Sequence, residues 1–89
     1  MKITALHILV NHEFEAVDLQ KKLAEGAAFE DLARDFSECP SGKDGGSLGE
    51  FGKGMMVPAF DKAAFLLFPG EVSSIVRTQF GFHLIKRTK

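Results

Sequence analysis

Residues 77–85 read R-T-Q-F-G-F-H-L-I, and this stretch indicates how the last part of the chain folds. β-Prone residues stand on both sides of Gly81, which lacks a side chain and can adopt the positive φ that tight turns often require. The stretch therefore predicts a β-hairpin, with strands over residues 75–78 and 82–87. One polar side chain, His83, stands inside the apolar part of the second strand.

The start of the chain has a similar arrangement. Residues 3–10 read I-T-A-L-H-I-L-V, a short apolar run that is largely β-prone. Successive side chains of a strand point to opposite faces, so His7 shares a face with Ala5 and Leu9, and both faces are apolar. A strand of this kind is expected in the middle of its sheet. If the first and last strands are neighbours, His7 and His83 meet on one face.

Amphipathic patterns between these strands predict three helices. Residues 13–25 carry a broad apolar stripe that ends at Gly26, and apolar residues recur at i, i+3, i+4 and i+7 from Phe29 to Phe36. A third helix is expected to begin at Pro58, because the first helical position tolerates the missing N–H of proline. Each apolar stripe needs a surface to cover, and the sheet supplies it.

The glycine-rich segment 37–54 contains six of the nine glycines and is expected to be a loop, with a brief strand over residues 48–51. A structured loop of this length in a small domain is usually functional. The predicted order is β-α-α-β-α-β-β. We expect a single α+β domain over residues 1–89, with a small, mainly antiparallel four-stranded sheet and helices packed around it.

Composition excludes several functional classes. Eleven basic and twelve acidic residues are interspersed and give a net charge of -1, so no basic stripe is available for nucleic acid or an anionic membrane. No apolar run approaches the roughly 18 residues of a membrane span, and the strand-like start leaves no signal peptide. The single cysteine cannot form an internal disulfide. These features favour a cytoplasmic location.

Four side chains are candidates for chemistry: His7, Cys39, Thr78 and His83. Each alone has an ordinary structural explanation, since a histidine in an apolar strand is usually hydrogen-bonded and a lone cysteine usually packs as a small apolar residue. The histidine pair is the stronger signal, because two imidazoles would meet on one face. A zinc site that includes His12 is not expected, since no C-x-x-C or H-x-x-x-H spacing is present.

Five blocks of sequence, in order and without a long gap, carry a resemblance to a known family. They are H-I-L-V at 7–10, C-P-S-G-K-D-G-G-S-L-G-E-F at 39–51, M-V-P-A-F-D-K-A-A-F at 56–65, P-G-E-V-S at 69–73 and T-Q-F-G-F-H-L-I-K at 78–86. Together they closely resemble the parvulin family of peptidyl-prolyl cis/trans isomerases, in its small single-domain prokaryotic form. Each block alone is moderately specific, whereas five in the same order are very specific.

This resemblance implies roles for individual residues. His7 and His83 match the two histidines at the floor of the family's active site, and Thr78 matches the hydroxyl residue bonded to them. Cys39 matches a position that holds cysteine or aspartate, so a hydrogen-bonded chain of these four residues is expected. Leu48, Met56 and Phe60 match the residues that form the apolar pocket for the proline ring. Phe80 matches a neighbouring wall position, and Gln79 falls beside the site.

The implied activity is non-covalent isomerisation of Xaa-Pro bonds in proline-containing peptides and in unfolded or flexible proteins. The resemblance implies a monomer that needs no metal or other cofactor. Phosphate-directed parvulins carry a basic cluster after the first strand, whereas residues 10–15 read V-N-H-E-F-E, so no preference for phosphoserine or phosphothreonine is expected. Two alternatives are open: a module that binds proline-containing segments without catalysis, and a thiol-dependent enzyme centred on Cys39.

Overall fold

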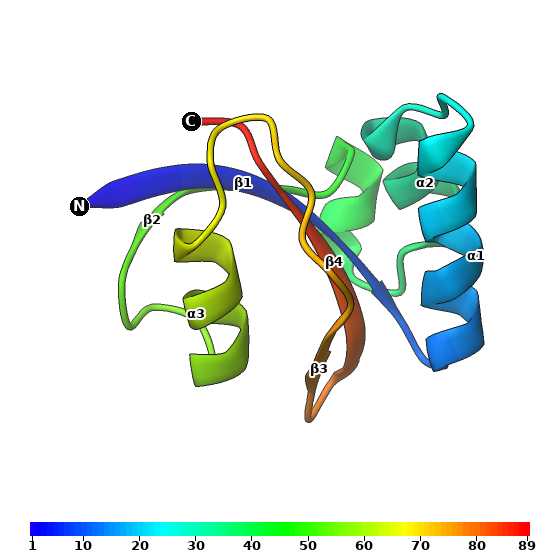
Figure 1. Cartoon of the computed structure of the whole chain (residues 1–89). Coiled ribbons are helices and arrows are strands. Elements are labelled where there is room, and N and C mark those ends of the chain that lie inside the picture. The colour runs from blue at the N-terminus through cyan, green and yellow to red at the C-terminus, as the bar shows by residue number, and fades with distance from the viewer.

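Four antiparallel strands form the centre of the structure, a computed structural model that describes residues 1–89 (Figure 1). The order across the sheet is β2-β1-β4-β3, so the first and last strands are the two inner ones. This confirms that the strand with two apolar faces lies inside the sheet. The strand bounds are β1 Lys2–Val10, β2 Ser47–Gly52, β3 Val76–Thr78 and β4 Gly81–Arg87.

The register of β1 against β4 decides where the histidines point. His7 lies opposite Ile85, and His83 lies opposite Leu9. Because residues that lie opposite each other share a face, the two histidines are diagonal neighbours on the same face. The hairpin of β3 and β4 turns at Gly81, whose φ of 138° is the positive value that the sequence predicted.

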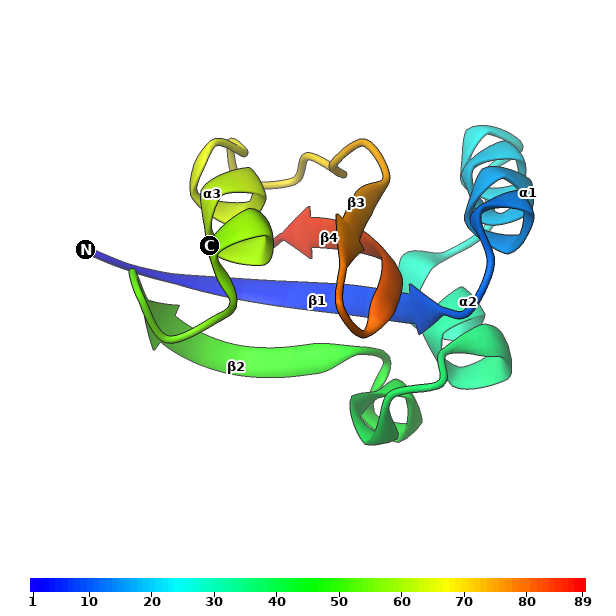
Figure 2. The same ribbon diagram turned by 90° about the horizontal axis from the view of Figure 1, so that it is seen from below.

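Helices cover both faces of the sheet, as the α+β prediction required. Helices α1 (Glu13–Ala24) and α2 (Phe29–Phe36) lie on one side of β1 and β4, and α3 (Pro58–Phe65) lies on the other (Figure 1). None of them has the length and apolar composition needed to cross a bilayer. Figure 2 shows β2 running beside β1 on the side away from β4.

Each layer of helices closes its own apolar core. The core on the side of α1 and α2 consists of Leu6, Ile8, Val10, Ala16, Leu19, Phe29, Leu32, Ala33 and Leu84. The core on the side of α3 consists of Ile3, Ala5, Phe51, Phe60, Ala64, Val76 and Ile85. The alternating side chains of β1 and β4 therefore serve both cores, which is why these two strands are apolar throughout.

The glycine-rich segment is more ordered than the sequence suggested. A 3-10 helix, η1 (Pro40–Asp44), occupies its first part, and β2 begins at Ser47 rather than near residue 48. Gly45 and Gly46 have φ values of 70° and 86°, so the turn between η1 and β2 uses a conformation that residues with a Cβ resist. This turn brings the carbonyl of Gly46 to the backbone N–H of His7, at 2.9 Å.

Phe36 corrects one detail of the predicted core. Its position in the apolar pattern of α2 placed it against the sheet, but 44% of the residue is exposed. Phe36 is the last residue of α2, and the ammonium of Lys22 lies 5.7 Å from its ring. The periodic pattern therefore continues one position past the surface that α2 covers.

Candidate active site

His7 and His83 form a buried pair on the α3 side of the sheet. Their Nδ1 atoms are 3.2 Å apart, and the two rings stack with centroids 5.4 Å apart and planes inclined by 19°. Only 5% of His7 and 4% of His83 is exposed. The diagonal register of β1 and β4 sets this geometry, as the sequence predicted for neighbouring first and last strands.

A chain of hydrogen bonds extends from the pair in both directions. His83 Nε2 lies 2.7 Å from Thr78 Oγ1, and His7 Nε2 lies 3.2 Å from Ser41 Oγ. Thr78 Oγ1 also accepts the backbone N–H of Phe80, at 3.1 Å. The network therefore joins the turn between β3 and β4 to η1 across the inner strands, and every buried polar atom in it has a partner.

Both rings are held in their neutral form. Burial lowers the pKa of His7 from 6.5 to about 4, and the neighbouring His83 adds to this effect. Burial also lowers the pKa of His83. A single proton between the two Nδ1 atoms makes one ring the donor and the other the acceptor, whereas two protons would face each other. The pair is thus a fixed dipolar element and a weak proton donor at neutral pH.

Phe60 of α3 packs its edge against both imidazoles. Its centroid lies 5.5 Å from that of His7 and 5.3 Å from that of His83, with interplanar angles of 80° and 82°. Phe60 itself is only 3% exposed. Leu48 and Met56 are half-buried against the same core. The structure thus brings the three residues predicted for the proline pocket into one core, where Phe60 is buried and the other two are partly exposed.

Gln79 and Phe80 lie at the turn between β3 and β4, immediately after Thr78. Both are exposed, Phe80 by 57%. Because the hydroxyl of Thr78 bonds both His83 and the backbone of Phe80, the turn is tied directly to the histidine pair. These two residues therefore lie at the edge of the network that contains the histidine pair.

The expected hydrogen-bonded chain from the histidines to Cys39 is wrong in its last member. Cys39 is the N-cap residue of η1 and is half-buried, and its thiol forms no hydrogen bond with either histidine. Its backbone N–H is bound by Ser37 Oγ, at 3.3 Å. The hydroxyl of Ser41, and not the thiol of Cys39, is the hydrogen-bond partner of His7. The geometry therefore gives no support to a Cys–His nucleophile pair.

Ser41 is the site residue that the sequence did not reveal. It stands two positions after Cys39 in a segment rich in glycine and serine, where no periodic pattern indicates the direction of a side chain. Only the turns of η1 place its hydroxyl beside His7. His12 is exposed at the start of α1, and no three His, Cys, Asp or Glu side chains lie close enough together to hold a metal ion.

The chain is similar to known proteins along nearly its whole length. The family model described as Rotamase, a PPIC-type PPIase domain, matches residues 7–89. The foldase protein PrsA of Bacillus subtilis is 51% identical over 89 residues, which are 99% of this chain and 30% of that protein. The chain thus spans less than a third of that relative.

Two solved structures share the fold over nearly the whole chain. The crystal structure of PrsA from Bacillus subtilis has a TM-score of 0.96 and 49% identity, covering 99% of this chain and 35% of that one. The solution structure of NmPin, the parvulin of Nitrosopumilus maritimus, has a TM-score of 0.88 and 46% identity, covering 99% of this chain and 96% of that one. With its histidine pair and its α+β sheet, the chain belongs to the PPIC-type peptidyl-prolyl isomerase domains, the parvulins.

Proposed function

We propose that this domain accelerates cis/trans isomerisation of Xaa-Pro peptide bonds without forming a covalent bond to its substrate. The observation that carries the proposal is the neutral, hydrogen-bonded pair of His7 and His83 beneath the apolar residues Phe60, Leu48 and Met56. Such a site offers an apolar wall to a proline ring and fixed dipoles to the carbonyl that precedes it.

The reaction neither forms nor breaks a covalent bond. Rotation about the tertiary amide of proline breaks resonance and faces a barrier of roughly 18–20 kcal/mol, which makes the uncatalysed exchange slow. An acceleration of about 10⁵-fold requires about 7 kcal/mol of stabilisation of the twisted amide. The twisted amide has a smaller carbonyl dipole than the planar one, so removal of water by an apolar pocket favours it. Leu48 and Met56 would hold the ring while the carbonyl rotates.

The histidines act in this proposal as a positioning element. Their lowered pKa values keep both rings uncharged at neutral pH, and the bonds to Thr78 and Ser41 fix the ring orientations. A fixed network costs no reorganisation when the amide twists, and this is how preorganised dipoles lower a barrier. Neither ring needs to exchange a proton with the substrate.

The proposed substrates are proline-containing segments of unfolded or flexible proteins. The similar protein from Bacillus subtilis is named a foldase, which supports a role in protein folding. Residues 11–15, which follow β1 and include Glu13 and Glu15 in the first turn of α1, contain no lysine or arginine, so a phosphate before proline should bring no advantage. The monomeric state and the cytoplasmic location stay predictions.

A protease-coupled assay with a proline tetrapeptide tests the proposal. Met56→Ala should lower kcat/KM about tenfold, because a loss of about 1.4 kcal/mol of apolar contact in the twisted state costs a factor of ten. Met55→Ala is the matched control, since Met55 is 68% exposed and lies outside the core around Phe60. Cys39→Ala should keep most of the activity. Equal losses in Met56→Ala and Met55→Ala would contradict the pocket.

The same assay separates the two alternatives. A binding module would bind the peptide, as judged by chemical-shift changes near His83 and Phe80, and would leave the rate of isomerisation unchanged. A thiol-dependent enzyme would lose its activity completely in Cys39→Ala and after alkylation of the cysteine. Met56 suits the test better than Phe60, because Phe60 is almost fully buried and its truncation would also destabilise the fold.

A further inference from the structure

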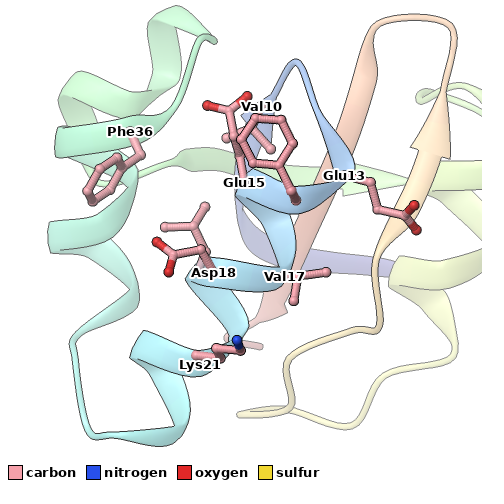
Figure 3. A pocket seen from close by; sticks show the side chains of 9 residues that line it. Val10, Glu13, Glu15, Val17, Asp18, Lys21 and Phe36 are labelled. Atoms are coloured by element: carbon pink, nitrogen blue, oxygen red, sulfur yellow. The ribbon is translucent and has the colours of Figure 1, made fainter.

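A groove runs along α1 on the side of the sheet that α1 and α2 cover, away from the histidine pair (Figure 3). Its volume is about 740 Å³, and its floor includes the core residues Val10 and Leu19. Three exposed apolar side chains line it: Phe14 is 71% exposed, Val17 39% and Phe36 44%. All three are apolar side chains that the fold leaves partly exposed to solvent along the groove.

Four charged residues line this groove, the acidic Glu13, Glu15 and Asp18 and the basic Lys21. Glu13 and Glu15 stand at the start of α1 and Lys21 near its end, and none of the three takes part in an ion pair, since the salt bridges are Asp18–Lys22 and Asp31–Arg34. Figure 3 shows Glu15 at one end of the lining side chains and Lys21 at the other. The unpaired charge along the groove is therefore acidic at the start of α1 and basic near its end, while Asp18, between them, is paired with Lys22 at 2.6 Å.

The dimensions of the groove limit what it can hold. The helix rise of about 1.5 Å per residue puts the start of α1 roughly 12 Å from Lys21, the length of about four residues of extended chain. A stable contact with a second copy would bury about 800 Å² on each partner, far more than a strip of three side chains along one helix provides. A short linear segment fits the surface better.

We propose that this groove binds an extended polypeptide segment of about four residues, with lysine or arginine at one end, large apolar side chains in the middle and an acidic residue at the other. The apolar side chains would cover Phe14, Val17 and Phe36, and most of the affinity would come from this burial. The end charges would orient the segment along α1. Unfolded proteins expose such segments, and the proposal requires neither a proline nor isomerase activity.

Titration of the ¹⁵N-labelled protein with the blocked peptide Lys-Leu-Phe-Asp tests the proposal without proline. We expect shifts at the amides of Val17, Asp18 and Phe36, and none at His83. Phe14→Ser should weaken binding roughly fivefold or more, because it removes an aromatic wall of the groove. Phe68→Ser is the matched control, since Phe68 is 74% exposed and does not line the groove; it should bind the peptide as the unchanged protein does.

Two altered peptides test the pattern itself. Lys-Ser-Ser-Asp should bind far more weakly because it has no apolar side chains, and Gln-Leu-Phe-Asn should bind measurably more weakly because it has no charges. The proposal is overturned if the shifts centre on His83 and Phe80, if Phe14→Ser and Phe68→Ser bind equally well, or if sedimentation shows a dimer that Phe14→Ser abolishes. Since no proline is present, failure here would leave the isomerase proposal untouched.

Discussion

The Nδ1 atoms of His7 and His83 lie 3.2 Å apart, although 76 positions separate the two residues in the sequence. At this distance the two nitrogens share one proton, so each ring fixes the tautomer of the other. The outer nitrogens then bind Thr78 and Ser41. A substitution at any member of this network should therefore alter the hydrogen bonds of the others.

The first prediction concerns pH. The pKa of His7 is lowered from 6.5 to about 4 in the folded protein, so between these values the unfolded chain binds a proton that the folded protein excludes. The free energy of unfolding should therefore decrease as the pH falls from about 6.5 to about 4, by roughly 3 kcal/mol from this group. Above pH 6.5, His7 is neutral in both the folded and the unfolded chain, so its contribution to the free energy of unfolding no longer changes.

Urea unfolding at several pH values measures this effect. His7→Leu removes the titrating ring and should show a clearly smaller loss of stability over the same range, although carboxylates still titrate in both proteins. His12→Gln is the control, because His12 is exposed and outside the network, and it should keep the full pH dependence. Identical slopes for the unchanged protein and His7→Leu would rule out this account.

The second prediction concerns the hydroxyl of Thr78. Thr78→Val keeps the shape of the side chain but leaves Nε2 of the buried His83 without its partner at 2.7 Å, which should destabilise the domain by roughly 1–3 kcal/mol. Thr88→Val is the control, since its exposed hydroxyl bonds the carbonyl of Thr4 at 3.2 Å and should cost less than about 1 kcal/mol. Urea midpoints provide the comparison, and similar costs for the two variants would contradict the network.

The third prediction concerns Gly46. A Cβ at this position would press against the backbone carbonyl oxygen of His7, and its φ of 86° is itself unfavourable for alanine. Gly54 has the same φ of 86° with no neighbouring atom in reach, so Gly54→Ala isolates the conformational cost of about 1–2 kcal/mol. Gly46→Ala should cost more than that and should also lower isomerase activity. Equal urea midpoints for Gly46→Ala and Gly54→Ala would show that the close approach of Gly46 to β1 does not affect stability.

The fourth prediction concerns substrate choice. Peptides with glutamate, serine or phosphoserine before proline should give kcat/KM values within about tenfold of one another. The reason is that residues 10–15, which include Glu13 and Glu15, contain no lysine or arginine that could bind a phosphate. A gain of more than tenfold for phosphoserine with the unchanged protein would refute the prediction.

Much of the fold could be predicted because the strands and helices obey simple periodicities. The two apolar faces of β1 placed it inside the sheet, whereas its pairing with β4 was only the condition under which the two histidines would meet, and the structure meets that condition. The pattern of α2 failed only at Phe36, because periodicity shows which side of a helix is apolar but not where the covered surface ends.

The site was harder to predict than the fold for a similar reason. Strand alternation placed His7 and His83 on one face, whereas the direction of each side chain in residues 37–46 depends on η1 and on two glycines with positive φ. No periodic rule covers such a segment, so sequence reasoning chose Cys39, and the structure gives the bond to Ser41. Residues on regular elements are predictable in a way that residues on irregular loops are not.

The central pairing of β1 with β4 also sets the order of events when the chain is made. β1 can find its inner neighbour only after residues 81–87 exist, and these contacts span most of the sequence, so their closure should be slow compared with formation of the helices. The histidine pair therefore forms only once residues 81–87 have paired with β1. A chain in which residues 81–87 have not yet paired has His7 without its neighbour, and its site is incomplete.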